Sequence, residues 1–340
     1  MQSQLQSQAN TTTTSKEPLL SVRSLRVEFP TRRGILTALD DVSLDIYPGE
    51  VLGMVGESGA GKSMTGNAII GLIERPGRIA AGEVRLQGQR IDNLAPEAMR
   101  KIRGKRIGMI FQDPLTSLNP LYRISEQLVE TIRTHLPLSA DQARKRAIDL
   151  LDEVGIPDAS RRIDDYPHQF SGGMRQRVVI ALALCADPDL VIADEPTTAL
   201  DVSVQAQIIE VMKRICAERG ASILLVTHDM GVIAETADRV AVMYAGRIAE
   251  IGPVREVIKH ARHPYTEGLM GAIPRLGENL DRLQQIPGAM PRLSAIPQGC
   301  AFNPRCPKVM EVCRQRRPDL MDVAPDHKTA CWLYSEGSKA

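Results

Sequence analysis

The stretch VLGMVGESGAGKS, Val51 to Ser63, joins a nearly continuous apolar run to a glycine-rich segment. The apolar run predicts a strand buried on both faces, and a helix is expected to follow at about 61–74. Between them, Gly56 to Ser63 fit the pattern G-x-x-x-x-G-K-S/T at every required position. This context of strand and helix predicts a phosphate-binding loop rather than a chance glycine turn.

The chemistry of this loop follows from its residue types. Glycines allow backbone N–H groups to converge on phosphate oxygens, and the start of the helix adds a dipole that favours an anion. Lys62 is expected to reach the terminal phosphates, and the Ser63 hydroxyl to bind magnesium. The predicted nucleotide-binding segment is Gly56, Glu57, Ser58, Gly59, Ala60, Gly61, Lys62 and Ser63.

A second apolar run, DLVIADEP from Asp189 to Pro196, contains two adjacent acids. A strand ending at Asp194 would place a carboxylate at the carboxyl edge of a parallel sheet, beside the phosphates, where it can hold magnesium. Glu195 is then the best-placed general base for a water molecule that attacks the terminal phosphate. The alternative is a chance pair of surface acids at a strand end. Such pairs are common, but this interpretation does not account for the apolar run that precedes them or for the phosphate-binding loop.

Two further apolar runs end in candidate site residues. His228 closes SILLVTH at 222–228, and this strand end is expected to aim it at the terminal phosphate. A buried, hydrogen-bonded histidine is the usual reading of a lone histidine. Gln112 follows RIGMIF at 106–111, where a polar residue alone is a weak signal.

The composition is that of a folded protein with no charge bias. The 340 residues are 43% hydrophobic and 24% charged, with a net charge of +1. No global field therefore draws the chain to nucleic acid, and aromatic residues, at 3%, argue against base-stacking platforms. No signal peptide is visible, and the apolar runs fall far short of the roughly 18 residues of a membrane span. We expect a cytosolic chain whose membrane association comes through a partner.

The order of the predicted elements indicates an α/β fold. Strands alternate with helices from about 106 to 228, as in a parallel sheet covered on both faces, whereas 19–50 read as antiparallel strands. Residues 113–170 predict a helical insertion, and 241–252 a hairpin that turns at Ala245-Gly246. The predicted domains are a disordered tail at 1–17, a nucleotide-binding domain at 18–258 and a loop-rich, proline-rich extension at 259–340.

The stretch FSGGMRQR, Phe170 to Arg177, carries no acid, cysteine or histidine at the start of an expected helix. Ser171 is a good N-cap, and Gly172 and Gly173 expose backbone N–H groups. These residues predict an anion site that has no base and no lysine.

In order and approximate spacing, the motifs resemble those of ABC-type ATPases over about residues 19–255. The resemblance implies an α/β P-loop fold with a mixed-sheet core, an antiparallel β subdomain and a helical subdomain at about 113–170. It also implies hydrolysis of ATP with Mg²⁺ by a catalytic set of Glu195, His228, Gln112 and Lys62. The motifs that carry it are GESGAGKS, Gln112, FSGGMRQR, LVIADEP, Ala199-Leu200-Asp201 and His228.

The resemblance assigns roles across a subunit interface. In the family, the surface formed here by Ser171 to Gly173 binds the terminal phosphate of ATP held by the facing subunit, so that two subunits enclose two nucleotides. Asp201 resembles the aspartate that crosses this interface, and Gln112 the glutamine that links magnesium to the membrane subunits. Phe29 is similar in place to the aromatic residue that stacks on adenine, although an ordinary core phenylalanine fits nearly as well. The implied magnesium ligands are Ser63, Gln112 and Asp194.

The extension resembles that of the ATP-binding subunits of bacterial dipeptide, oligopeptide and nickel importers, through HPYT at 263–266, IPGAMP and GCAFNPRCP. FQDPLTSLNP and DEPTTALDVSVQAQII also look like that subfamily. The resemblance implies an ATPase at the cytoplasmic face of the inner membrane that powers the import of peptides or a related small solute. Its implied partners are two transmembrane permease subunits, a second ATPase subunit, usually a paralogue, and indirectly an extracytoplasmic solute-binding protein.

A soluble ABC ATPase that acts on ribosomes or DNA is the alternative. Such proteins generally carry two cassettes in one chain or a long coiled coil, and this sequence has neither. The balanced charge also counts against a nucleic-acid partner.

The six cysteines fall into two groups. Cys185 and Cys216 lie in apolar helical patterns and are interpreted as small buried hydrophobes. For the other four, disulfides do not suit a reducing cytosol, and zinc sites usually include a close C-x₂₋₄-C pair that is missing here. Four thiolates can hold a 4Fe-4S cluster, and some members of the subfamily carry one at these positions. An iron–sulfur cluster, zinc and no metal all stay open for Cys300, Cys306, Cys313 and Cys331.

Overall fold

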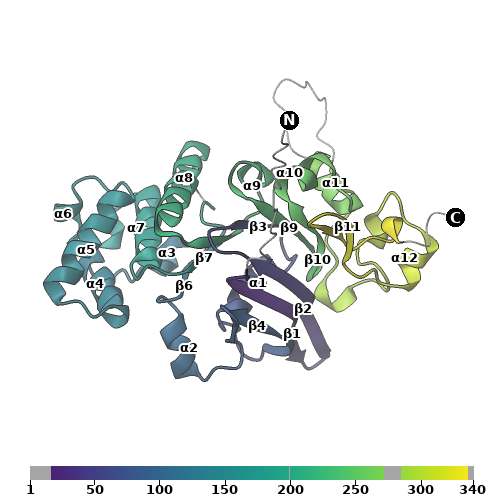
Figure 1. Ribbon diagram of the computed structural model, residues 1–340, viewed down its shortest axis with the longest axis horizontal. Helices are drawn as coiled ribbons and strands as arrows, with labels where there is room; N and C mark the ends of the chain where they lie inside the picture. Colours follow the sequence, from purple (N-terminus) through teal and green to yellow (C-terminus); the bar gives the residue numbers. More distant parts are fainter. Residues whose placement is uncertain (1–16, 199, 272–284, 336–340) are drawn as a thin grey trace, which may run out of the picture.

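The computed structural model describes residues 17–198, 200–271 and 285–335, so nearly all of the predicted tail at 1–17 lies outside the described residues. Its centre is an eight-stranded sheet with the order β11-β12-β10-β9-β3-β8-β7-β6 (Figure 1). The strands from β9 to β6 are parallel, and β10, β12 and β11 continue the sheet antiparallel beyond β9. The strands are β3 (Val51–Val55), β6 (Ile107–Ile110), β7 (Leu190–Asp194), β8 (Ser222–Val226), β9 (Arg239–Tyr244), β10 (Arg247–Pro253), β11 (Met321–Ala324) and β12 (His327–Thr329).

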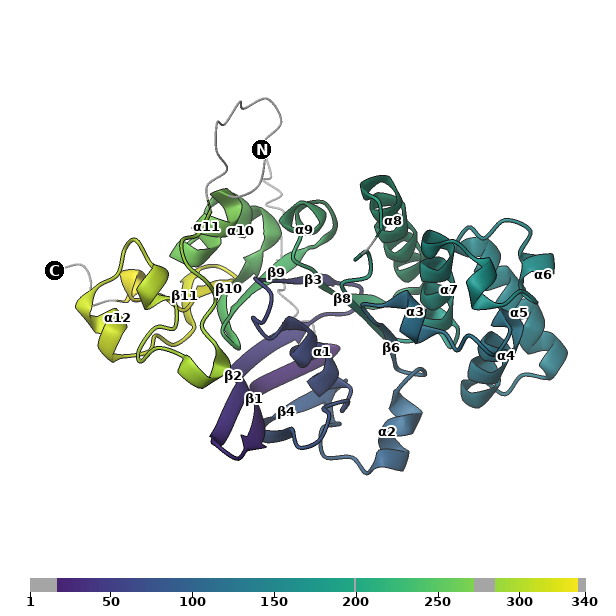
Figure 2. The same cartoon turned by 180° about the vertical axis from the view of Figure 1, so that it is seen from behind.

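A second sheet is antiparallel, as the alternating pattern predicts, and has the order β2-β1-β4-β5. It lies beside α1 and against the central sheet in both views (Figure 2). Apolar side chains of both sheets share one buried cluster, which includes Leu20 and Val22 from β1 and Leu52 and Met54 from β3. Its strands are β1 (Leu20–Thr31), β2 (Gly34–Ile46), β4 (Arg78–Leu86) and β5 (Gln89–Arg90).

The predicted helical insertion is confirmed, because the described residues between β6 and α7 form helices and no strand. The helices α4, α5 and α6 gather at one end of the molecule, beyond β6 and β7 (Figure 1). The helices of the chain are α1 (Lys62–Ile69), α2 (Pro96–Ile102), α3 (Pro114–Ser117), α4 (Ile124–His135), α5 (Ala140–Glu153), α6 (Ala159–Arg162), α7 (Gly172–Leu184), α8 (Val202–Arg219), α9 (Met230–Thr236), α10 (Val254–Lys259), α11 (Pro264–Gly271) and α12 (Glu311–Gln315), with short 3₁₀ turns η1 (Pro167–Gln169), η2 (Leu293–Ala295), η3 (Asn303–Arg305) and η4 (Trp332–Tyr334).

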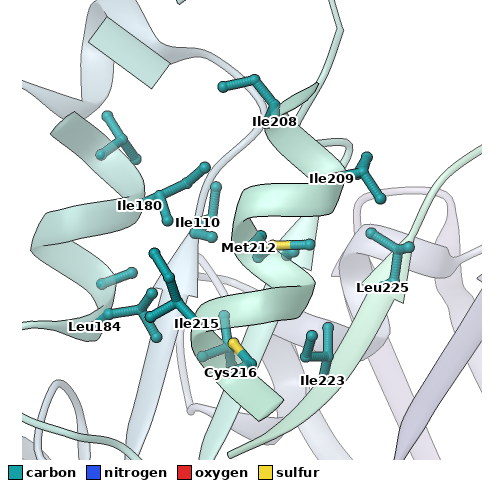
Figure 3. Close-up of a cluster of buried hydrophobic side chains, with 14 of the residues drawn as sticks. Ile110, Ile180, Leu184, Ile208, Ile209, Met212, Ile215, Cys216, Ile223 and Leu225 are labelled. Carbon is teal, nitrogen blue, oxygen red and sulfur yellow. The ribbon is translucent and has the colours of Figure 1, made fainter. Parts of the chain in front are cut away.

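The strands of the central sheet are apolar because they pack into a core that α8 shares with α7 and the sheet. Figure 3 shows α8 directing Met212 and Ile215 into the space between α7 and the central sheet. The sheet contributes Ile223 and Leu225 from β8, which are buried like every other residue of that strand. Burial raises the pKa of Cys216, on α8, to about 12, and Cys185 behaves alike. Both thiols are thus the buried hydrophobes that the sequence predicts.

One predicted helix boundary differs from the structure. The helix expected at about 61–74 ends at Ile69, because Gly71 turns the chain into the left-handed region with φ +65°.

The extension is more regular than its many prolines suggest, since β12 pairs with β10 and β11 pairs with β12. The predicted hairpin turn is confirmed at Ala245-Gly246, between β9 and β10. In the part of the chain that the structure describes, no helix is both long and apolar enough to cross a membrane.

Candidate active site at the carboxyl edge of the central sheet

The phosphate-binding loop follows β3 in a conformation that depends on glycine. Gly56, Gly59 and Gly61 have φ values of +151°, +82° and +107°. A Cβ atom on Gly56 would lie 2.4 Å from the carbonyl oxygen of Met243, so the backbone of β9 leaves no room for a side chain. These glycines bring the loop close to the sheet and leave its backbone curved around the start of α1.

Lys62 crosses the loop that precedes it. Its Nζ donates to the carbonyl oxygens of Gly56 at 2.9 Å and of Glu57 at 3.3 Å, and lies 3.9 Å from Oε1 of Glu195. The side chain is only 5% exposed, and burial lowers the pKa of its ammonium group against the opposing effect of Glu195 and Asp194. The lysine is thus a partly desolvated cation at the centre of the loop, where it acts strongly on a nearby anion.

Ser63 and Asp194 meet from two elements that are far apart in the sequence. The Ser63 hydroxyl, in the first turn of α1, donates to Oδ1 of Asp194 at the end of β7, over 2.8 Å. Asp194 is 6% exposed, and burial raises the pKa of its carboxyl group, although the bond from Ser63 opposes this shift. A hydroxyl and a carboxylate side by side are ligands that Mg²⁺ prefers, so these residues fit the ion that the family uses.

Glu195, directly after β7, contacts side chains that follow β6 and β8 and one from its own turn. Its Oε2 accepts from Nε2 of Gln112 at 2.9 Å and from the Thr198 hydroxyl at 3.0 Å. Its Oε1 lies 3.5 Å from Nδ1 of His228. Glu195 adopts φ +45°, a rare value for a residue other than glycine, and such backbone outliers gather at functional sites. The sequence predicts that Gln112, Glu195 and His228 lie together, and the geometry agrees with this.

A cavity of about 280 Å³ opens over the loop. Gln112 and Glu195 line one side of it, and Leu293 of the extension contributes to the wall. Leu293 could not be predicted as a site residue, because its place depends on how η2 packs against β2. Phe29 does not line this cavity. Its ring instead lies against Gly77. The predicted contact of Phe29 with adenine stays a prediction.

The FSGGMRQR segment lies elsewhere on the surface. Ser171 caps α7, and its hydroxyl accepts from the backbone N–H of Met174 at 3.4 Å. Ser171 and Gly172 are exposed and do not line the cavity over the phosphate-binding loop. Asp201 is also exposed at the start of α8, and Leu200 lies next to Gly172. Ala199, the first residue of the predicted Ala-Leu-Asp motif, lies outside the described residues.

The four cysteines of the extension come from separate segments, one of which is helix α12, and lie near one another. The backbone N–H of Cys300 donates to the carbonyl oxygen of Cys313 at 2.8 Å. Burial, together with the neighbouring cysteines, raises the pKa of the Cys300 thiol to about 11 and of the Cys331 thiol to about 12. Within the described ranges, no group of three or more His, Cys, Asp or Glu side chains is arranged to hold a single metal ion.

Comparison with known proteins decides the family. The ABC transporter family matches residues 39–198, and the family described as "Oligopeptide/dipeptide transporter, C-terminal region" matches residues 249–313. A protein of Brucella melitensis named "Putative peptide import ATP-binding protein" is 49% identical over 334 residues, which cover 95% of this chain and 99% of that protein. This chain belongs to the ABC transporter family.

Other members of the ABC transporter family support the assignment. The oligopeptide transport ATP-binding protein OppD of Mycobacterium tuberculosis is 50% identical over 316 residues, which cover 92% of this chain and 52% of that protein. Among solved structures, a dimeric ATP-binding cassette with bound ADP and phosphate has a TM-score of 0.63 and 30% identity, and the match covers 69% of this chain and 99% of that cassette. The predicted ABC-type P-loop fold is therefore confirmed, and the chain is an ATPase that converts ATP and water to ADP and phosphate.

We predict that Glu195→Gln in this ABC ATPase lowers ATP turnover at least about a hundredfold, because the amide cannot accept the proton of the attacking water. MgATP should still bind, since Lys62, Ser63 and Asp194 are unchanged. Release of phosphate and binding of a labelled ATP analogue measure the two properties separately.

The matched control is Glu210→Gln, which makes the same change at an exposed position of α8. Its turnover should equal that of the unchanged protein. Near-normal hydrolysis by Glu195→Gln would remove Glu195 from the role of general base.

Proposed function

We propose that this chain hydrolyses ATP to drive the import of peptides through a membrane permease. The observation that carries the proposal is its likeness, at 49% and 50% identity, to proteins named for peptide import and oligopeptide transport. The match to the C-terminal region of oligopeptide and dipeptide transporters supports the same substrate class. A soluble ABC ATPase acting on ribosomes or DNA is not favoured by these relatives.

In the proposed reaction, the loop from Gly56 to Ser63 holds the triphosphate of ATP, and Lys62 neutralises its terminal charge. Magnesium, when held by Ser63, Asp194 and Gln112, would withdraw charge from the phosphate oxygens. Glu195 accepts a proton from the water whose oxygen forms the new bond to the terminal phosphorus, and the bond to ADP breaks. The contacts to Gln112 and His228 hold the Glu195 carboxylate in place.

We further propose that a second ATPase subunit completes the site. Ser171 and Gly172 stand exposed at the amino end of a 13-residue helix, outside the cavity of their own chain. Their backbone N–H groups and the helix dipole suit the terminal phosphate of ATP bound to a facing subunit. Asp201 lies on the same exposed surface and would cross the interface. The expected partner is a paralogue, or else a second copy of this chain.

An apolar cavity offers a place for the permease. It has a volume of about 270 Å³ and lies between β6, α7 and the loop after α1. Its wall includes Leu72 and Phe111, which are 38% and 41% exposed, and Phe111 directly precedes Gln112. We propose that an apolar-faced helix of each permease subunit docks here, which would place the chain at the cytoplasmic face of the inner membrane. Movement of such a helix would reach the nucleotide through Gln112.

The four extension cysteines are proposed to hold a 4Fe-4S cluster. Burial raises the pKa of the Cys300 and Cys331 thiols, so these two thiolates would form only with a compensating cation. The ligand sulfur atoms of a 4Fe-4S cluster lie farther apart than those of a single metal ion. This wider spacing suits four neighbouring thiols that form no single-ion site. The cluster would join the turns around Cys300, Cys306, Cys313 and Cys331.

We predict that Ser171→Arg leaves MgATP binding to the chain's own loop unchanged but prevents closure with the second subunit, because the long cation would fill the place of the phosphate. Assembly in the presence of MgATP, followed by size-exclusion chromatography on the Glu195→Gln background, measures closure. Ser171→Ala is the control, since it removes the same helix cap without added bulk, and it should still close. Normal closure of Ser171→Arg would contradict the assignment of this surface.

We predict that Leu72→Asp lowers uptake of a labelled short peptide at least about tenfold in cells that depend on this ATPase, because burying an unpaired carboxylate in an apolar contact costs several kcal/mol. ATP binding by the purified chain should not change. Ala217→Asp adds the same charge at an exposed position of α8 and should transport normally. Uptake that is unaffected by Leu72→Asp would remove the permease from this cavity.

We predict that the full chain, purified without oxygen, is brown and contains about four iron and four sulfide ions per molecule. Cys306→Ser should lose most of this iron because it removes one of four ligands, whereas Cys185→Ser, in the core next to α7, should keep it. Elemental analysis and the visible spectrum provide the measurement. Stoichiometric zinc, or a colourless protein without metal, would contradict the cluster.

A further inference from the structure

Two residues of the extension contact Glu57 of the phosphate-binding loop. The backbone N–H of Glu57 donates to the phenolic oxygen of Tyr265 at 2.9 Å. Nη1 of Arg305 pairs with Oε2 of Glu57 at 3.1 Å. The carbonyl oxygen of Glu57 accepts from Nζ of Lys62 at 3.3 Å. The residue after the first loop glycine is therefore fixed at its N–H, its C=O and its side chain, and two of the three contacts come from the extension.

Tyr265, from the HPYT segment, is held rigidly. Its side chain is fully buried, and its ring packs against those of Tyr244 and Phe302 at centroid distances of 4.7 Å and 5.5 Å. Its backbone N–H donates to Nδ1 of His263 at 3.0 Å. Burial lowers the pKa of His263 to about 4, so this ring is neutral near pH 7 and can accept the bond. Burial also raises the pKa of Tyr265, which keeps its phenol neutral.

Arg305 approaches Glu57 from η3, directly before Cys306. Its side chain is only 7% exposed and also donates to the carbonyl oxygen of Pro287 at 2.8 Å. Its guanidinium lies 5.8 Å from the ring centroid of Tyr244 and 5.9 Å from that of Phe302. A planar cation with this many partners cannot follow Glu57 if the loop moves, so the pair restrains the loop.

We propose that Tyr265 and Arg305 are positioning residues for nucleotide binding, through which the C-terminal extension sets the shape and charge of the phosphate-binding loop. The inference rests on the proposed ATPase site and adds a role for the HPYT segment. Tyr265 fixes the direction of the peptide group between Gly56 and Glu57, and the carbonyl oxygen of that group, on Gly56, accepts from Nζ of Lys62 at 2.9 Å. Arg305 balances the Glu57 carboxylate, which would otherwise add negative charge beside a triphosphate.

The main test compares Arg305→Ala with Lys308→Ala in the full chain, with MgATP affinity measured by calorimetry. Arg305→Ala should weaken binding about tenfold, because it leaves the Glu57 carboxylate unpaired next to the phosphates. Lys308 also pairs with a glutamate, Glu267, at 2.7 Å on the exposed surface of the extension, and its removal should leave affinity unchanged. Equal affinities for Arg305→Ala and the unchanged protein would overturn the inference.

A double-mutant cycle separates positioning from general stability. If Arg305 acts through Glu57, then Arg305→Ala should change affinity less than about twofold in a Glu57→Ala background. A purely structural role would give the same loss in both backgrounds, and this result would also overturn the inference.

Tyr265→Phe is an independent variant that keeps the ring and its packing. It leaves the Glu57 N–H without its acceptor, so hydrogen exchange at Glu57 should become faster and MgATP binding several-fold weaker. Exchange and affinity that both match the unchanged protein would contradict the role of Tyr265. Failure of the unchanged protein to bind MgATP would instead reject the proposed function itself, so the two failures are distinguishable.

Discussion

The hydrogen bond between Ser63 and Asp194 fixes the arrangement on which the site depends. It joins the start of α1 to the end of β7 over 2.8 Å, although 131 residues separate the two in the sequence. The bond can form because β3 and β7 run parallel on either side of β8, so that their carboxyl ends face the same edge. The phosphate-binding loop and the acidic strand end thereby lie next to each other. The apolar strands, buried on both faces, hold this edge rigid.

Much of this edge could be predicted from the sequence, because its signals are local. An apolar run shows a buried strand, and the residue that follows it must lie at the strand end; this predicts the places of Gln112, Glu195 and His228. The end of α1 could not be predicted, because it depends on the left-handed turn at Gly71. Leu293, Tyr265 and Arg305 were also missed as site residues. They come from segments without periodicity, and only the packing of rings and backbone carbonyls brings them to the loop.

The extension is thus a structural part of the ATPase site rather than an appendage. Strands β11 and β12 lengthen the central sheet, and aromatic side chains around Phe302 fill the space between the extension and β9. The segment from Cys300 to Cys306 carries both two of the clustered thiols and Arg305. Arg305, which pairs with Glu57, thus directly precedes one of these cysteines, Cys306.

We propose that the nucleotide is shared between two subunits. Within one chain, the cavity over the phosphate-binding loop has no contribution from Ser171 or Gly172, and both are exposed. A structure of the assembled transporter with MgATP tests this most directly. We expect the terminal phosphate to lie between Lys62 of one subunit and the helix N-terminus at Ser171 of the other. A triphosphate enclosed wholly by one chain, with Ser171 facing solvent in the closed complex, would contradict it.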